Sequence, residues 1–161
     1  MKPRNDGIII LPLDTAHIAE IVRLEARCFS NPWSSEAFAS VCENAMYTYY
    51  MAIDSVSGSI CGCGGMYTVL DSADITNIAV LPDYREKGIG SLLLEALIEC
   101  AEKNGVTSLH LEVRESNSAA RRLYEKFGFE IDGKRKKYYR RPTEDAILMT
   151  KRFYTGTEKE K

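Results

Sequence analysis

Apolar residues recur at helical spacing in four stretches of the chain, and residues that favour helix ends lie beside them. Ser34 is placed to cap the second stretch, and Gly128 is placed to end the fourth. The predicted helices run from Asp14 or Thr15 to Cys28, from Ser34 to about Asn44, from Gly88 to Lys103 and from Ser118 to Lys126.

Between these stretches the apolar pattern is continuous or alternating, which is typical of strands. The clearest case is TSLHLEVR at residues 107–114, where every second residue is apolar. The predicted strands cover residues 8–13, 47–54, 59–70, 75–81, 107–114, 128–139 and 145–153.

The connections between these elements predict the topology. The short connection after residue 54 favours an antiparallel hairpin, whereas the helix after residue 81 favours a parallel pair joined by a right-handed crossover. We therefore expect a single-domain α/β fold whose mixed, mostly antiparallel sheet has a central parallel β-α-β core flanked by helices. The domain is expected to cover residues 1–154, and residues 155–161 are expected to be a disordered tail.

Composition narrows the class of protein. The chain has 161 residues and a net charge of -2, so it suits one globular domain without a general attraction for nucleic acid or anionic lipid. No apolar run approaches the roughly 18 residues of a membrane span, and the cytoplasm is the expected compartment. The odd number of cysteines, five, favours reduced thiols. Cys61 and Cys63 are expected on one face of a strand as core residues, so no metal site is predicted.

The segment REKGIG, residues 85–90, joins a predicted strand to the clearest predicted helix. Gly88 and Gly90 allow close approach to a ligand, and the free N–H groups of a helix N-terminus attract anions. The segment lacks the third glycine of a dinucleotide-binding fingerprint, and the chain contains no P-loop pattern. Arg-x-x-Gly-x-Gly then suits a diphosphate, with a tight packing turn as the alternative.

The residues around this turn resemble the acyl-CoA-binding core of the GCN5-related N-acetyltransferase superfamily, whose signature is [R/Q]-x-x-G-x-[G/A]. The resemblance continues through LEVRESNSAARRLYEKFGFE, and CFSNPWS and YYRRPTEDAILM are similar to segments of bacterial ribosomal-protein-alanine N-acetyltransferases. It implies acetyl-CoA as cosubstrate, with two strands splayed apart so that backbone groups near Ile78-Ala79-Val80 pair with its pantetheine arm. It also implies that the N–H groups of 86–91 hold the pyrophosphate and that Asn117 contacts the cofactor, although Asn117 equally suits a helix cap. The predicted cofactor-binding residues are Ile78, Ala79, Val80, Arg85, Glu86, Lys87, Gly88, Ile89, Gly90, Ser91 and Asn117.

Acetyl transfer to an amine requires a base for the ammonium, stabilisation of the oxyanion and a proton for the departing thiolate. Glu112 is the predicted base, because it is an acid within an alternating strand and matches the family glutamate; the alternative is a solvated residue paired with Arg114. Tyr124 is the predicted acid, because a phenol with a pKa of about 10 is protonated at neutral pH. Tyr124 also matches the family tyrosine. Its alternative is a packing aromatic. His110 is expected to be structural.

For the acceptor, Phe29, Trp33, Tyr138 and Tyr139 resemble the peptide-gripping residues of the family, although Trp33 equally suits a core anchor. The predicted acceptor is the α-amine of a protein, because an α-amine loses its proton more easily than the side chain of lysine. The resemblance implies that this protein is a ribosomal protein that begins with alanine. Glu144 and Asp145 could attract a cationic acceptor. Acetylation of lysine or of a small amine is the alternative reaction.

Two non-enzymatic alternatives remain from the sequence. The stretch 134–141 consists of basic and aromatic residues, which can pair with phosphates and stack on bases in an RNA-binding module. The acidic net charge argues against that alternative. A cofactor-binding regulator without turnover is the other, and the presence of both Glu112 and Tyr124 argues against it.

Overall fold

The computed structural model describes residues 7–154, so the predicted tail at 155–161 lies outside the described residues. The helices are α1 (Ile18–Cys28), α2 (Ser35–Glu43), α3 (Ile89–Lys103) and α4 (Ser118–Lys126), with short 3-10 helices at Thr15–His17 and Pro82–Tyr84. The strands are β1 (Ile8–Pro12), β2 (Tyr47–Asp54), β3 (Ile60–Val69), β4 (Ser72–Val80), β5 (Ser108–Arg114), β6 (Glu130–Tyr139) and β7 (Glu144–Arg152). All predicted elements are present. The largest differences are that α1 begins at Ile18, three or four residues after the predicted start, and that β4 begins at Ser72, three residues before it.

The seven strands form a sheet in the order β1-β2-β3-β4-β5-β7-β6. The pairs β1–β2, β2–β3, β5–β7 and β6–β7 are antiparallel, whereas β4 and β5 are parallel, with Ala73 opposite Leu109. The mixed α/β fold with a parallel β-α-β core is therefore confirmed.

The described residues form two compact units, and each is described by itself. Unit 1 comprises residues 7–67 and 76–100, and unit 2 comprises residues 68–75 and 101–154. The division passes through β3, β4 and α3. The predicted domain bounds of 1–154 remain a proposal.

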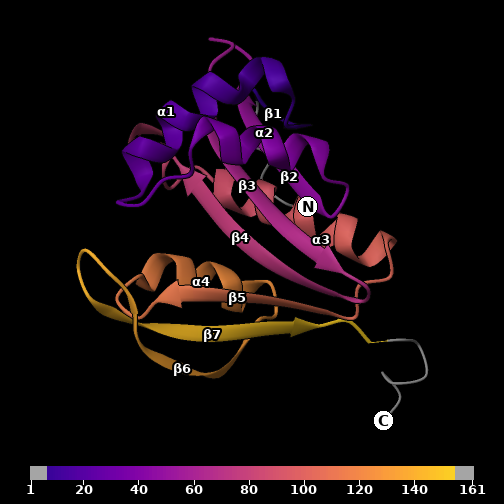
Figure 1. Cartoon of the computed structure of the whole chain (residues 1–161), viewed down its shortest axis with the longest axis vertical. Helices are drawn as coiled ribbons and strands as arrows, with labels where there is room; N and C mark the ends of the chain where they lie inside the picture. Colours follow the sequence, from indigo (N-terminus) through magenta and orange to yellow (C-terminus); the bar gives the residue numbers. More distant parts are fainter. Residues whose placement is uncertain (1–6, 155–161) are drawn as a thin grey trace. The chain divides into compact units, whose positions relative to one another are not determined.

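Helices cover both faces of the sheet in unit 1 (Figure 1). On one face, Ile21 and Leu24 of α1 and Phe38 of α2 pack against Tyr49 and Met51 of β2. On the other, Ile89 and Leu93 of α3 pack with Ala52, Tyr50 and Cys61. Successive β2 residues face opposite sides because side chains alternate along a strand.

The expectation that Cys61 and Cys63 share one face is wrong. Cys63 packs with the α1 and α2 cluster, whereas Cys61 packs with α3. The register between β2 and β3 shifts here: Ala52 lies opposite Gly62, but Ile53 lies opposite Ile60. Cys61 is the extra residue of a β-bulge, and a bulge breaks the alternation of side chains that the strand spacing implies.

In unit 2, β5 pairs with β7 and β7 pairs with β6, while α4 connects β5 to β6. The alternating pattern of β5 places its apolar residues on one buried face, as predicted: Leu109, Leu111 and Val113 are buried. Tyr124 of α4 packs edge-on against Phe129, with ring centroids 5.6 Å apart. No helix within residues 7–154 is long and apolar enough to cross a membrane.

Candidate active site

The REKGIG turn of unit 1 adopts an unusual backbone conformation directly before α3. Glu86 has a φ of 64° and Gly88 a φ of 80°, both in the left-handed region. The first amide groups of an α-helix have no intrahelical acceptor, and turns with left-handed residues gather N–H groups into anion-binding concavities. The first turn of α3 contains no acidic residue. The geometry and charge of this turn therefore fit a pyrophosphate group.

The predicted cofactor residues of β4 and of the turn are joined at Val80. Arg85 Nε donates to the carbonyl oxygen of Val80 at 3.0 Å, and Cys28 Sγ donates to the same oxygen at 3.6 Å. Lys87 Nζ lies 5.4 Å from the ring centroid of Tyr84, whose hydroxyl donates to Asp54 at 2.8 Å. The turn is thus fixed to the end of β4, and the cation of Lys87 lies beside it.

The two predicted acceptor residues of unit 1 differ in their surroundings. Trp33 is half-buried against Phe38, Tyr47 and Tyr49, with ring centroids 5.3, 6.2 and 6.3 Å away. Phe29 follows α1 and is 38% exposed. The packing of Trp33 fits the core-anchor alternative, whereas Phe29 is accessible.

Sequence reasoning missed a buried polar network in unit 1. Glu25 of α1 is only 1% exposed, and burial raises the pKa of its carboxyl group to about 7. Asn77 Nδ2 donates to Glu25 at 2.9 Å and to the hydroxyl of Tyr49 at 3.0 Å. That hydroxyl in turn donates to Cys63 Sγ at 3.4 Å. The network joins α1, β2 and β3 to β4, one residue before Ile78. The available signal was an acid within the apolar stripe of α1.

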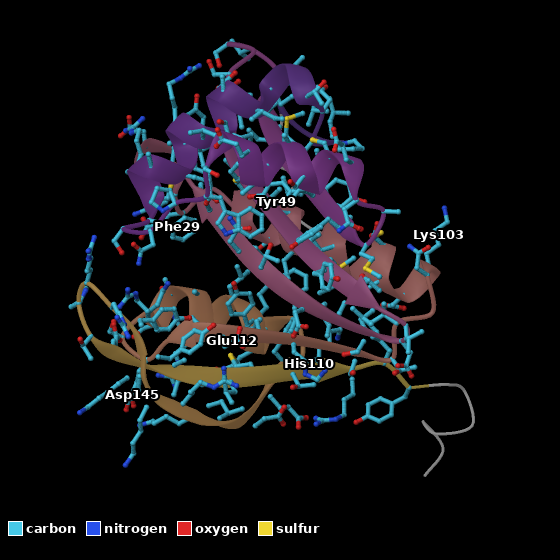
Figure 2. All side chains as sticks on the ribbon, in the orientation of Figure 1. Phe29, Tyr49, Lys103, His110, Glu112 and Asp145 are labelled. Carbon is cyan, nitrogen blue, oxygen red and sulfur yellow. The ribbon has the colours of Figure 1, made fainter. Side chains whose placement is uncertain are left out.

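Glu112, Tyr124 and Tyr139 belong to β5, α4 and β6 of unit 2. Burial raises the pKa of Tyr139, and the neighbouring Tyr138 and Glu112 raise it further. Burial also raises the pKa of Tyr124 to about 12, so this phenol remains protonated at neutral pH. Glu112, labelled in Figure 2, is half-buried on β5 opposite Leu148.

Asn117 caps α4, because its side-chain oxygen accepts from the N–H of Ala120 at 3.1 Å. The capping interaction uses the oxygen and leaves the amide NH₂ to face other groups, so capping and cofactor contact are compatible. His110 lies between two hydroxyls, at 2.9 Å from Thr150 and 3.0 Å from Ser108. This arrangement fits the structural role expected for it.

The acidic residues expected to attract a cationic acceptor have partners inside unit 2 instead. Glu144 accepts from the N–H of Ser116 at 2.5 Å and from Arg114 at 3.3 Å, and both contacts lower its pKa. Asp145 accepts from the N–H of Lys137 at 2.9 Å. The ion pair of Arg114 is with Glu144 and not with Glu112, which weakens the alternative that Glu112 is a charge partner of Arg114.

One positive charge of the basic stretch 134–141 is neutralised by an acidic residue of unit 2. Lys134 pairs with Glu115 at 2.7 Å, and Arg135 stacks over the ring of Tyr138 at 5.2 Å. Tyr138 is 43% exposed and lies edge-on to Tyr139, with centroids 5.0 Å apart. The two predicted acceptor residues of unit 2 are therefore in direct contact.

Two other features lie apart from these residues. A cavity of about 470 Å³ in unit 1 contains none of the predicted site residues in its lining, which comes from Pro12, Leu13, 41–45 and 47–50. All five cysteines have free thiols, and no cluster of His, Cys, Asp or Glu within residues 7–154 could hold a metal ion.

Comparisons with known proteins identify the family of this chain. The model of the acetyltransferase (GNAT) family matches residues 18–129, which include the glycine turn, Glu112 and Tyr124. The ribosomal protein bS18-alanine N-acetyltransferase of Escherichia coli strain K12 is 42% identical over 144 residues, covering 87% of this chain and 94% of that protein. The crystal structure of the ribosomal-protein-S18-alanine N-acetyltransferase from Escherichia coli has a TM-score of 0.84 at 38% identity and covers 92% of this chain and 96% of that one. A chain in the crystal structure of the NatC complex bound to Gag peptide and CoA has a TM-score of 0.82 at 27% identity, with 92% of this chain and 99% of that one covered.

The fold and the site thus define an N-acetyltransferase. This chain belongs to the acetyltransferase (GNAT) family.

Proposed function

We propose that this enzyme transfers the acetyl group of acetyl-CoA to the N-terminal α-amine of a ribosomal protein that begins with alanine. The acceptor is supported by the name of the Escherichia coli relative, with which the alignment covers most of both chains. The cosubstrate is supported by the REKGIG turn, whose left-handed residues and unpaired helix amides suit a pyrophosphate.

Acetyl-CoA supplies an activated thioester, and the residues of this chain bind it and move protons. The N–H groups of 86–91 hold the pyrophosphate, with Arg85 and Lys87 adding positive charge, and the backbone of Ile78–Val80 hydrogen-bonds the pantetheine arm. The NH₂ group of Asn117 adds a further contact. The domain that carries these residues is 1–154.

Glu112 takes a proton from the attacking α-ammonium, directly or through water. The nitrogen forms a bond to the acetyl carbon while the carbon–sulfur bond breaks. Tyr124, which its pKa of about 12 keeps protonated at neutral pH, donates a hydrogen bond and then its proton to the departing sulfur. The second proton of the attacking nitrogen then passes to Tyr124 and restores the phenol. The observation that carries this assignment is that Glu112 is half-buried between the buried residues Leu111 and Val113, while the neighbouring cation Arg114 pairs with Glu144.

In this proposal Phe29 and Trp33 of unit 1, and Tyr138 and Tyr139 of unit 2, each contact the acceptor. The test is acetyl-CoA turnover on two peptides of one sequence that begins with alanine. One peptide has a free N-terminus and no lysine, and the other has a blocked N-terminus and one internal lysine. Transfer to the first peptide alone is expected, whereas transfer to the second alone would make this a lysine acetyltransferase. Turnover with only a small amine would reject a protein acceptor.

A further inference from the structure

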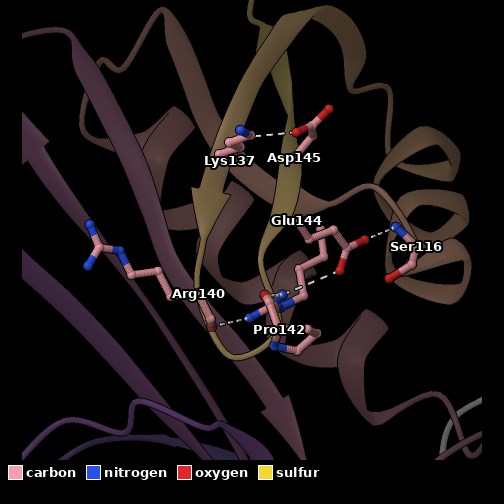
Figure 3. A network of polar contacts seen from close by, with 7 residues as sticks. Ser116, Lys137, Arg140, Pro142, Glu144 and Asp145 are labelled. Atoms are coloured by element: carbon pink, nitrogen blue, oxygen red, sulfur yellow. Dashed lines mark hydrogen bonds and ion pairs between the residues drawn. The ribbon is translucent and has the colours of Figure 1, made fainter.

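Arg114 of β5 holds the turn between β6 and β7 through three hydrogen bonds, whose acceptor residues Arg140, Pro142 and Glu144 are labelled in Figure 3. Arg114 donates to the carbonyl oxygen of Pro142 at 2.9 Å, to that of Arg140 at 3.1 Å and to the carboxylate of Glu144 at 3.3 Å. Its guanidinium carbon also lies 4.5 Å from the ring centroid of Tyr139. A single planar group therefore contacts both sides of the turn and the ring that precedes it.

The backbone conformation of this turn is unfavourable without stabilising contacts from side chains. Lys137 and Arg141 have φ values of 53° and 59°, a region that residues with a Cβ seldom adopt. The N–H of Lys137 donates to Asp145, within the irregularity that separates Arg135 from Tyr139 in the β6–β7 register. Carboxylates of β7 and the guanidinium of Arg114 thus stabilise an otherwise unfavourable backbone. The residues between these two strained positions include Tyr138 and Tyr139.

Glu144 extends the contact toward α4. Its second oxygen accepts from the N–H of Ser116, which immediately precedes the helix cap Asn117. Arg114 is 26% exposed and Glu144 is 18% exposed, so water competes only partly for this pair. The turn, Tyr139 and the segment before α4 are therefore tied to one ion pair.

We propose that Arg114 is a positioning residue for the acceptor, which with Glu144 fixes the β6–β7 turn so that Tyr138 and Tyr139 present a preformed binding surface. The inference rests on the proposed function for the identity of the acceptor. The geometry requires arginine, because only a planar fork of donors contacts two carbonyl oxygens and a carboxylate together. Lysine has the same charge and three donor hydrogens, but these share one nitrogen, so lysine cannot replace the two separate nitrogens with which Arg114 reaches Pro142 and Arg140.

The test compares Arg114→Lys with the matched variant Arg152→Lys. Arg152 also belongs to unit 2 and pairs with Asp132 at 3.4 Å, but its contact is away from the turn. For Arg114→Lys we expect the KM for the alanine peptide to rise about tenfold, the KM for acetyl-CoA to change less than about twofold and kcat to fall only slightly. Arg152→Lys should leave all three values unchanged.

Hydrogen exchange of the amides at residues 138–141 and 143, measured on the full chain, provides a readout that needs no acceptor. Exchange should accelerate in Arg114→Lys and not in Arg152→Lys. An unchanged exchange rate would show that the fork is unnecessary, and an unchanged peptide KM despite faster exchange would show that the turn is only structural. Equal increases in the KM for both substrates would indicate general damage. Each of these results would overturn the inference.

Failure of the proposed function gives a different pattern. If wild-type protein acetylates lysine or a small amine instead, the same KM comparison is made with that acceptor, and the positioning role stands or falls on it. If wild-type protein uses no amine, the proposed function fails, and unaltered exchange in Arg114→Lys would reject the positioning role independently.

Discussion

The ring of Tyr49 occupies the space in which a side chain at residue 65 would lie. A Cβ added to Gly65 would be 2.2 Å from Tyr49 Cδ2 and 3.1 Å from the carbonyl oxygen of Thr48. The close approach of this ring to β3 accompanies the hydrogen bonds of its hydroxyl with Asn77 and Cys63. The glycine is therefore a steric requirement for the buried polar network of unit 1.

Gly65→Ala should lower the free energy of unfolding by about 1–3 kcal/mol, because the Tyr49 ring must move out of a packed core. Urea denaturation measures this loss. Gly133→Ala is the matched control in a strand, since the nearest atom to its added Cβ is 3.9 Å away, and its stability should change by less than about 0.5 kcal/mol. Equal stability of the two variants would contradict the close packing described for Tyr49.

Glu25→Gln should alter the dependence of stability on pH. The pKa of Glu25 is raised from 4.5 to about 7, so between these values the folded state binds more protons than the unfolded state. The contribution of this group to stability is therefore complete below about pH 4.5 and is lost as pH rises through about 7, on the order of 3 kcal/mol.

A glutamine at this position cannot ionise. The free energy of unfolding of Glu25→Gln, relative to that of wild type, should therefore be higher at pH 9 than at pH 5. Urea denaturation of both proteins at the two pH values gives the difference. Glu43→Gln, at an exposed position of α2, is the control and should show no such change. A wild-type protein that gains stability relative to Glu25→Gln between pH 5 and pH 9 would refute the assignment.

Glu112→Gln should lower kcat by about 10²–10⁴-fold, because the amide cannot accept the ammonium proton. The KM for acetyl-CoA should remain near the wild-type value, since the side chain is not assigned to cofactor binding. Glu130→Gln is an exposed control on β6 and should retain full activity. Steady-state kinetics with the alanine peptide measures both variants, and a loss below about tenfold would exclude Glu112 as an essential base.

Tyr124→Phe should lower kcat by about 10–10³-fold while the contact with Phe129 keeps the fold stable. Because burial raises the pKa of Tyr124 to about 12, its ionisation should not reduce wild-type kcat below about pH 11. A pH–rate profile and thermal unfolding provide the two measurements. Wild-type activity in Tyr124→Phe would assign this ring to packing alone.

Gly88→Ala should raise the KM for acetyl-CoA about tenfold, because a Cβ at a φ of 80° strains the turn that we propose holds the pyrophosphate. Gly105→Ala is the matched control, since Gly105 has a φ of 78° and nothing lies within 4 Å of an added Cβ. Both variants should lose about 1 kcal/mol of stability from backbone strain. An identical KM for the two variants would remove Gly88 from the cofactor site.

The elements of this fold were predictable because each depends on residues close together in the chain. The alternation of TSLHLEVR is sufficient to define β5, and the caps Ser34 and Asn117 accept the backbone hydrogen bonds expected of them. The glycine turn was also predictable, because its backbone conformation and its position before α3 follow from a local pattern. Its proposed role in binding acetyl-CoA depends in addition on resemblance to a family.

The sequence by itself thus determined the helices, the strands, the glycine turn and the family. Only the tertiary structure decided which distant residues become partners. Periodicity assigned Arg114 and Glu112 to one face of β5, but β7 brings Glu144 to Arg114 from 30 positions away. The spacing of Cys61 and Cys63 could not reveal a bulge that depends on pairing with β2. Burial of Glu25 likewise depends on Asn77, 52 positions away in the chain. The physical reason is that local spacing sets the direction of a side chain, whereas register and packing between elements determine the groups that it contacts.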